Sequence, residues 1–287
     1  EFSVRALELT ADVIEHNSAN YTAWWYRRRC LKELHADLHA EIVFTDKWSR
    51  DCPKNYQVWY HRRWLITELA AQLRENQQGE PPASVEEKIR DLAERELEYH
   101  LDTMHVNDDY KNYNGWSHRQ FIVEKFGLWD HELAFVENLL RDDIRNNSAW
   151  NHRYTTVRRT KWPLTQEGRQ QEIDFTLQAL RGGANNESAW NYLAAFLGEG
   201  EGKVPWDSMP AVEAFCREVI AQAPEPRQCC RFACEGLAQI YEARHQTAEA
   251  LGQYELLKDI DKIRTKYWDW RAALLRQRTD GGEVKAS

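Results

Sequence analysis

The sequence predicts an all-α protein, folded as a right-handed superhelical solenoid of antiparallel helix pairs and similar in plan to tetratricopeptide repeats. The first observation is a recurring pattern, Asn-x-x-x-Trp-x-x-Arg, whose complete copies begin at Asn20, Asn55, Asn112 and Asn146. A fifth copy, which begins at Asn186, has Leu193 in place of the arginine, and a sixth keeps only its tryptophan and arginine. No stretch shows the alternation typical of a β-strand.

The spacing of the repeats is the second observation. Successive motif tryptophans, at positions 24, 59, 116, 150, 190 and 268, are separated by 35, 57, 34, 40 and 78 residues. Steps of 34 to 40 fit one helix pair per repeat, 57 fits one repeat with an insertion of about 22 residues, and 78 fits about two repeats. We therefore expect one helical-repeat domain over residues 1–278, with five clear repeats, a degenerate C-terminal repeat, an insertion at about 75–84, and a flexible tail at 279–287.

Local chemistry predicts where the helices begin and end. The asparagine that opens each motif is a good N-cap, and prolines or glycines at 53, 127, 163 and 182–183 stop helices. Beyond the insertion, Ser84 is expected to cap the next helix, with Glu87 at the capping-box position. These signals predict helices at about 4–16, 21–34, 37–49, 56–74, 85–105, 113–126, 130–145, 147–161, 165–180, 187–196, 209–223, 226–245, 247–258 and 261–276.

Composition excludes several classes of protein. A net charge of -8 and a pI near 5.8 argue against nucleic acid as a partner, and no apolar run approaches the ~20 residues that span a bilayer. Arginine runs at 27–29, 62–63 and 158–159 lie on predicted helices, where inter-helix packing and ion pairing explain them. The six cysteines have no regular spacing, which indicates reduced thiols and a cytoplasmic location.

We expect no metal site in this chain. His35 and His39 are four residues apart near Glu41, a spacing that can hold zinc on a helix, yet they lie at a helix junction without a third ligand in place. Cys230 and Cys234 share a helical face but have no matching second pair, so buried free thiols are the simpler interpretation. The glycine-rich segment 198–203 lacks the strand and the Ser/Thr of a phosphate-binding loop, so it is interpreted as a connection.

The stretch from Pro53 to Arg63 contains the main candidate binding residues. If Asn55 caps the helix, Tyr56 and Gln57 lie in its first turn, where backbone N–H groups are unpaired and the helix dipole is positive. Lys54 lies just outside this end. A helix N-terminus beside a lysine favours an anion, so the residues predict an anion site; a solvated turn lysine is the plainer alternative.

Several segments resemble the repeats of protein prenyltransferase α subunits. They are Pro53–Trp59 (PKNYQVW), Lys111–Tyr113 (KNY), Asn146–Asn151 (NNSAWN) and Asn186–Tyr192 (NESAWNY). Within that family the sequence is most similar to the subunit shared by protein farnesyltransferase and geranylgeranyltransferase type I. The Rab geranylgeranyltransferase α subunit is an alternative, but it commonly carries extra domains for which this chain has no room.

The resemblance implies helix pairs wrapped around a β subunit, whose barrel supplies the prenyl pocket and the zinc site. Such a heterodimer transfers farnesyl or geranylgeranyl from its diphosphate to the cysteine of a C-terminal Cys-a-a-X motif. The implied cofactors are zinc, bound by the β subunit and not by this chain, and magnesium. A non-enzymatic scaffold that binds proteins or peptides is the competing hypothesis, although a scaffold has no reason to place lysine, tyrosine and glutamine at one helix start.

The resemblance also assigns roles to residues. Lys54 matches the family lysine that meets the diphosphate and is the expected catalytic residue, and Gln57 matches the glutamine that meets the substrate's C-terminal carboxylate. Asn114 lies where animal members have histidine and is a candidate substrate-binding residue. Three tyrosines are expected near the isoprenoid and diphosphate: Tyr21, Tyr56 and Tyr113. The alternative is that these tyrosines pack between repeats.

Overall fold

The computed structural model describes residues 2–77, 79–198, 200 and 202–280, and most of these residues lie in helices joined by turns and loops. They contain fourteen α-helices and three short 3₁₀ helices, and their extended pairing is a single bridge between Leu197 and Val204. The prediction of an all-α helical-repeat protein is confirmed. The chain divides between Phe135 and Val136 into two compact units, and the prediction of one continuous domain stays a prediction.

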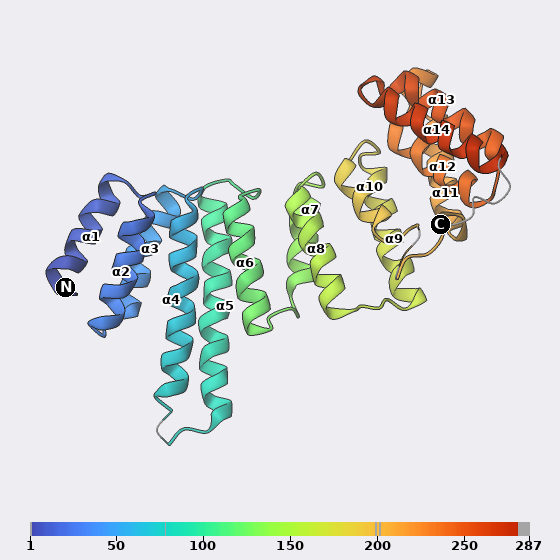
Figure 1. The fold of residues 1–287 in the computed structure, drawn as a ribbon. Coiled ribbons are helices and arrows are strands. Elements are labelled where there is room, and N and C mark those ends of the chain that lie inside the picture. The colour runs from blue at the N-terminus through green and yellow to red at the C-terminus, as the bar shows by residue number, and fades with distance from the viewer. Residues whose placement is uncertain (1, 78, 199, 201, 281–287) are drawn as a thin grey trace. The chain divides into compact units, whose positions relative to one another are not determined.

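The first unit is built from antiparallel helix neighbours (Figure 1). Its helices are α1 (Val4–His16), α2 (Tyr21–Glu33), α3 (Leu38–Asp51), α4 (Tyr56–Glu75), α5 (Pro82–Val106) and α6 (Tyr113–Phe126). The motif copies lie at the starts of α2, α4 and α6. Because α4 packs against α2, α3, α5 and α6, it is the central helix of this unit.

The second unit continues the series after α7 (Glu132–Asp142), which spans the division. Its α-helices are α8 (Asn147–Thr160), α9 (Gln166–Arg181), α10 (Glu187–Ala194), α11 (Pro210–Ala221), α12 (Arg231–Ala243), α13 (Thr247–Ile260) and α14 (Thr265–Asp280). Three 3₁₀ helices lie at Trp206–Ser208, Pro226–Gln228 and Lys262–Arg264. Within this unit, α9 packs on α10, and α11 to α14 pack each on the next.

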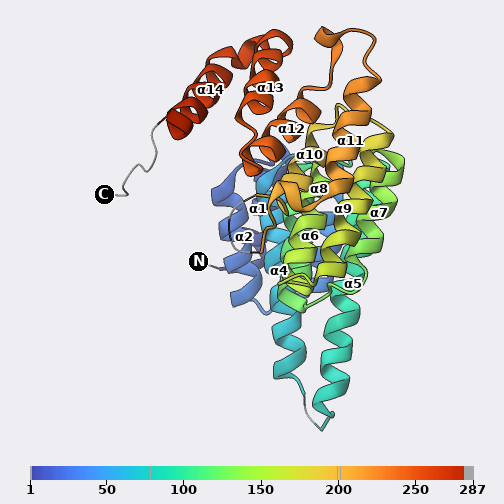
Figure 2. The ribbon, with the colours of Figure 1, turned by 90° about the vertical axis from the view of Figure 1, so that its right-hand side faces the viewer.

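The insertion differs from its prediction. Much of its length lies in α4 and α5, which have 20 and 25 residues where α2 and α3 have 13 and 14. These two helices run side by side beyond their neighbours (Figures 1 and 2). Ser84 is not the cap: α5 begins earlier, with Pro82 at its first position and no side-chain cap bond from Pro81. Proline fits this position because the missing N–H would have no helical partner there.

Other helix boundaries also differ from those predicted. The helix predicted at 226–245 is a 3₁₀ turn followed by α12, and the one predicted at 130–145 is the shorter α7. Thr279, predicted to lie in the flexible tail, belongs to α14, and residues 281–287 lie outside the described residues. At the two ends of α1, Val4 is exposed, whereas Ile14 is fully buried.

Each motif asparagine caps its helix as predicted. In all five copies its backbone is extended and its side-chain oxygen accepts a hydrogen bond from a first-turn N–H. The motif tryptophan packs inward, and its Nε1 donates to the carbonyl six residues earlier. These bonds, 2.7 to 2.8 Å long, join Trp24 to Ser18, Trp59 to Pro53, Trp116 to Tyr110, Trp150 to Ile144 and Trp190 to Ala184.

Three of these carbonyls also join one repeat to the next. The Nδ2 atoms of Asn55, Asn112 and Asn186 donate to the carbonyl oxygens of Ser18, Pro53 and Ile144 at 2.5, 2.9 and 2.7 Å. Each of these asparagines therefore caps its own helix with its oxygen and bonds the preceding repeat with its nitrogen. Aspartate could cap the helix but could not donate at neutral pH, and serine has a single oxygen for both contacts, whereas asparagine has a separate acceptor and donor; this explains its recurrence.

A buried polar ladder accompanies the tryptophans. In the four complete copies the motif arginine pairs with a buried glutamate at 2.5 to 2.8 Å and stacks on the aromatic ring three residues after that glutamate. The sets are Arg27 with Glu41 and Phe44, Arg62 with Glu96 and Tyr99, Arg119 with Glu132 and Phe135, and Arg153 with Glu172 and Phe175. The prediction that the motif arginines serve packing and ion pairing is confirmed.

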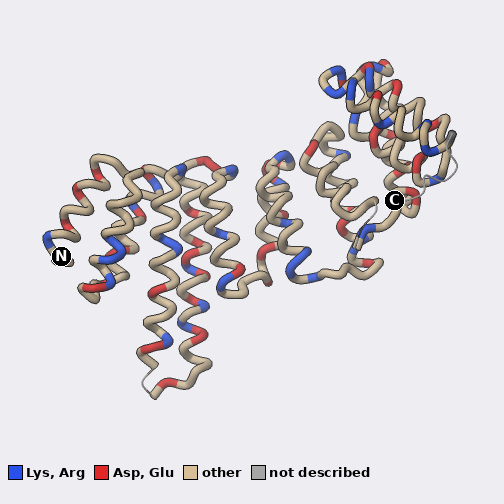
Figure 3. Tube along the Cα trace, in the orientation of Figure 1, with Lys and Arg blue, Asp and Glu red and all other residues tan. Residues whose placement is uncertain are grey.

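Charged residues of both signs are spread along the helices. Lys and Arg are interspersed with Asp and Glu along both units (Figure 3). Within the part of the chain that the structure describes, no helix combines the length and the apolar character needed to cross a bilayer.

Candidate functional site

The starts of α2, α4 and α6 present three tyrosines at equivalent positions. Tyr21, Tyr56 and Tyr113 are the first residues of their helices, and they are 70%, 55% and 81% exposed. This exposure argues against the alternative that these tyrosines pack between repeats. Tyr56 stacks on Tyr60, one turn later in α4, with ring centroids 5.9 Å apart. The three rings therefore offer apolar surface to a ligand or a partner.

A shallow depression of about 600 Å³ lies at the start of α4. It is lined by Ser18, Ala19 and residues 51–57, so the predicted set Lys54, Tyr56 and Gln57 shares one hollow. The Lys54 side chain is 83% exposed. The half-buried amide of Gln57 makes no hydrogen bond with the described part of the chain. An ammonium and an unpaired amide thus stand together at the positive end of a helix, where an anion is favoured.

Asn114 meets Lys54 directly. From the second position of α6, its Nδ2 donates to the Lys54 carbonyl oxygen at 2.9 Å. The Lys54 ammonium lies 3.8 Å from Asp109 Oδ2, in the turn before α6. The structure therefore brings Asn114 into contact with Lys54, but its amide is engaged by the chain and Asn114 does not line the depression. Tyr21 and Tyr113 do not line the depression.

Two arginines beside these helix starts meet only part of the sequence prediction. Arg28 and Arg63 pack between helices as expected, but neither has a carboxylate partner among the described residues, unlike Arg27 and Arg62. Arg28 stacks on the Tyr60 ring at 4.9 Å, and Arg63 Nη2 donates to Ser117 Oγ at 2.7 Å. Burial lowers the pKa of both guanidinium groups.

These arginines share a helix face with the exposed aromatic residues. On α2 and α4 the positions three before, one after and four after the motif tryptophan fall on one side, because they are spaced at i, i+4 and i+7. We call this set the aromatic–arginine face: Tyr21, Trp25 and Arg28 on α2, and Tyr56, Tyr60 and Arg63 on α4. This spacing of two aromatic residues and an arginine is visible in the sequence and could have predicted the face.

Of the candidate metal ligands, Glu41 is engaged by other side chains. Glu41 accepts hydrogen bonds from Arg27 and His61, and within the described ranges no three His, Cys, Asp or Glu side chains form a metal-binding group. Cys230 and Cys234 are free and buried, as interpreted from the sequence. Burial raises the pKa of Cys234 to about 12, so its thiol stays protonated at neutral pH. Positions 199 and 201 of the glycine-rich segment lie outside the described residues.

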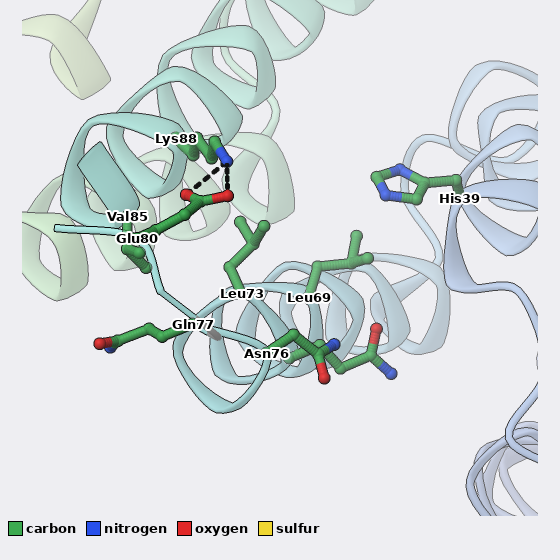
Figure 4. A pocket seen from close by; sticks show the side chains of 9 residues that line it. His39, Leu69, Leu73, Asn76, Gln77, Glu80, Val85 and Lys88 are labelled. Carbon is green, nitrogen blue, oxygen red and sulfur yellow. Dashed lines mark hydrogen bonds and ion pairs between the residues drawn. The ribbon is translucent and has the colours of Figure 1, made fainter. Parts of the chain in front are cut away.

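A second depression, of about 280 Å³, lies at the far end of the α4–α5 hairpin. Figure 4 shows Leu69 and Leu73 of α4 inside it, with the Lys88 ammonium on the Glu80 carboxylate at one side and His39 at the other. None of the motif residues at the helix starts lines it. The chemistry expected from the sequence therefore belongs to the first depression.

The repeats match a known family. Residues 4–34, 38–69, 129–160 and 169–199 match the protein prenyltransferase alpha subunit repeat. Residues 70–128 are not matched, yet α6 carries the same asparagine cap, tryptophan bond and arginine pair as the matched repeats.

Full-length relatives agree with this match. The chain is 34% identical to the protein farnesyltransferase/geranylgeranyltransferase type-1 subunit alpha of Solanum lycopersicum, over 96% of this chain and 78% of that protein. It is 33% identical to the protein of the same name from Arabidopsis thaliana, over 94% of this chain and 81% of that protein. A solved structure, Candida albicans protein geranylgeranyltransferase-I complexed with GGPP, matches with a TM-score of 0.78 and 29% identity, covering 96% of this chain and 85% of that one. The chain therefore belongs to the protein prenyltransferase α-subunit family, within the group of subunits shared by farnesyltransferase and geranylgeranyltransferase type I.

Proposed function

We propose that this chain is the α subunit of a heterodimeric enzyme that transfers farnesyl or geranylgeranyl from its diphosphate to the cysteine of a C-terminal Cys-a-a-X motif. The names of its relatives support this assignment, as does the fact that its structural relative was solved in complex with GGPP. The observation that carries it is the joint presence of Lys54, Tyr56 and Gln57 in one open depression at a helix start.

Lys54 acts on the diphosphate. As the bond between the prenyl carbon and the diphosphate oxygen breaks, negative charge builds on that oxygen. An ammonium and a positive helix end stabilise this charge more in the transition state than in the bound substrate. Gln57 binds the carboxylate at the end of the protein substrate, because its unpaired amide can donate there. Tyr21, Tyr56 and Tyr113 contact the isoprenoid and the diphosphate from the same edge.

The aromatic–arginine face is where the β subunit packs. Tyr, Trp and Arg are the residue types enriched in the cores of protein interfaces, and this face combines exposed aromatic rings with half-buried arginines. Arg28 and Arg63 lack carboxylates in the described chain and would receive them from the partner. As the resemblance implies, we assign zinc to the β subunit; the described residues of this chain offer no metal-binding group. The six free cysteines support a cytoplasmic location.

The test is to co-express this chain with the β subunits of its own organism and to assay each purified complex. The substrates are farnesyl diphosphate or geranylgeranyl diphosphate with a dansylated peptide that ends in Cys-a-a-X. We expect a stable 1:1 complex that prenylates the peptide cysteine, and a Cys-to-Ser peptide is the control. Failure to form a complex with any β subunit, or a complex inactive with both diphosphates, contradicts the proposal.

A further inference from the structure

We propose that Asn114 is a positioning residue that holds the peptide of Lys54 in place from the next repeat. This inference rests on the proposed function, in which Lys54 meets the prenyl diphosphate. In this proposal Asn114 does not bind the substrate itself but acts through Lys54. A side chain of α6 then supports the site at the start of α4.

The two peptide carbonyls that precede the α4 cap are both held. Asn114 Nδ2 donates to the Lys54 oxygen at 2.9 Å. The Pro53 oxygen accepts from Asn112 Nδ2 at 2.9 Å and from Trp59 Nε1 at 2.7 Å. Since consecutive carbonyls are tied to α6 and α4, the backbone that carries the lysine has little freedom to turn. The direction in which the Lys54 side chain leaves the backbone is thereby fixed.

The bond from Asn112 belongs to the general repeat, but the bond from Asn114 does not. The asparagine-to-carbonyl bond recurs at Asn55 and Asn186. At the helix position equivalent to Asn114, the other repeats have Thr22, Gln57, Ser148 and Ser188. In the described part of the chain, none of these four side chains bonds the preceding repeat. The additional bond therefore occurs at the one repeat junction that contains the proposed catalytic lysine.

The ammonium of Lys54 is oriented from the same turn. Its Nζ lies 3.8 Å from Asp109 Oδ2, and Asp109 Oδ2 also accepts from Asn112 Nδ2 at 3.4 Å. Residues 109–114 thus contact Lys54 at both its backbone and its charged end. A diphosphate carries more negative charge than one carboxylate, so it displaces Asp109 from the ammonium without disturbing the backbone bond.

The expected consequence is a loss of rate rather than of affinity. Lys54 stabilises the leaving oxygen only if its ammonium reaches that atom, and small displacements of a catalytic group are costly. Removing one neutral hydrogen bond corresponds to roughly a 3- to 10-fold change. We expect Asn114→Ala to slow the single-turnover rate by about this factor, with the affinity for the prenyl diphosphate changed less than about twofold.

The experiment is a double-mutant cycle on the complex of this chain with its co-expressed β subunit. Single-turnover rates and prenyl diphosphate affinities are measured for wild type, Asn114→Ala, Lys54→Ala and the double variant. Asn114→Gln, which keeps an amide donor, should recover most of the rate. Ser148→Ala, at the equivalent position of α8, is the matched control and should leave the rate unchanged. In the Lys54→Ala background, Asn114→Ala should add less than about a twofold loss.

Two results overturn the inference, and they can be told apart. If Asn114→Ala slows the reaction equally with and without Lys54, Asn114 acts on the fold or on the substrate, while the proposed function stands. If Lys54→Ala itself leaves the single-turnover rate unchanged, the role of Lys54 in the proposed function fails, and the inference fails with it.

Discussion

His118 bonds Glu96 across a repeat boundary: His118 Nε2 lies 2.6 Å from Glu96 Oε1, and both side chains are buried. Glu96 also pairs with Arg62 of its own repeat, so one carboxylate joins two successive motif helices. The charge of Arg62 and the bond from His118 hold the pKa of Glu96 below its usual range, against the effect of burial. As the carboxylate can only accept, His118 donates from Nε2, and its buried Nδ1 has no partner among the residues that the structure describes. Glu41 and His61 repeat this arrangement one step earlier.

The first prediction is a loss of stability in mild acid. Burial lowers the pKa of His118, with Arg62 and Arg63 adding to the effect and Glu96 opposing it. As pH falls through about 6.5, the unfolded chain binds a proton at this histidine before the folded chain does, so the free energy of unfolding falls. Each such histidine contributes a slope of up to about 1.4 kcal/mol per pH unit below that value.

Urea unfolding of wild type and His118→Gln between pH 7 and pH 5 measures this slope. Glutamine can keep the bond to Glu96 but does not titrate, so the variant should lose less stability on acidification. Identical slopes for the two proteins would show that His118 does not carry the effect. The carboxylates act at lower pH: because the pKa of Glu96 is lowered in the fold, its contribution is lost only below its unfolded value of about 4.3.

The second prediction separates the two uses of the motif asparagine. Asn186→Asp keeps the oxygen that caps Ser188 but loses the donor to the Ile144 carbonyl, which lies 2.7 Å from the buried Asn186 amide. Aspartate caps helices as well as asparagine does, so capping alone predicts no change. We expect a loss of about 1 to 3 kcal/mol in the free energy of unfolding, because the carbonyl loses one of its two donors, keeps only Trp150 Nε1, and faces a charge.

The matched control for this substitution is Asn20→Asp. Asn20 caps the first motif helix through Ala23, and its amide makes no hydrogen bond within the described ranges. Its stability should be nearly unchanged. Equal losses at the two positions would mean that capping, and not the bond between repeats, explains the asparagines.

Sequence reasoning succeeded where the chemistry is local. The asparagine caps, the inward tryptophans and the Gly127 helix end depend on residues within one or two turns. The carboxylate partners could not be read in the same way. Arg27 finds Glu41 14 residues away, but Arg62 finds Glu96 34 residues away, because the long α4–α5 hairpin separates them. A period measured between tryptophans does not give the position of a partner on the return helix.

Adjacent arginines were also hard to separate. Arg62 and Arg63 are neighbours in the sequence, but consecutive residues of a helix point about 100° apart. One side chain therefore enters the polar ladder, and the other joins the aromatic–arginine face. A histidine also follows the motif tryptophan by two residues, at 61, 118 and 152. This recurrence was visible in the sequence, but the Asn-x-x-x-Trp-x-x-Arg pattern did not include it. Of the candidate site, the grouping of Lys54, Tyr56 and Gln57 followed from one helix start, whereas the contact from Asn114 depends on the next repeat.

The third prediction concerns Lys54. Lys54→Ala should raise the activation free energy of prenyl transfer by about 2 to 4 kcal/mol, with a smaller change in prenyl diphosphate affinity. Single-turnover rates of the complex measure the chemical step separately from product release. Arg145→Ala is the matched control, because Arg145 is an exposed cation before the cap of α8 and should not affect the rate. If both variants are as fast as wild type, Lys54 is a surface residue.

The last prediction concerns Gln57, which is proposed to bind and not to transform. Its amide has no partner in the described part of the chain and lies in the first turn of α4, where the helix dipole favours a carboxylate. Since this contact is equal in the ground and transition states, Gln57→Ala should weaken peptide binding by about 1 to 3 kcal/mol. This loss should appear as a higher KM for the peptide with little change in kcat. The effect should disappear when the peptide's C-terminus is amidated, because the negative charge that the glutamine binds is then absent. The measurement is a two-by-two comparison of wild type and variant against free-acid and amidated peptides. Equal weakening of both peptides would place Gln57 in support of the helix or of the subunit interface, and the carboxylate assignment would be wrong.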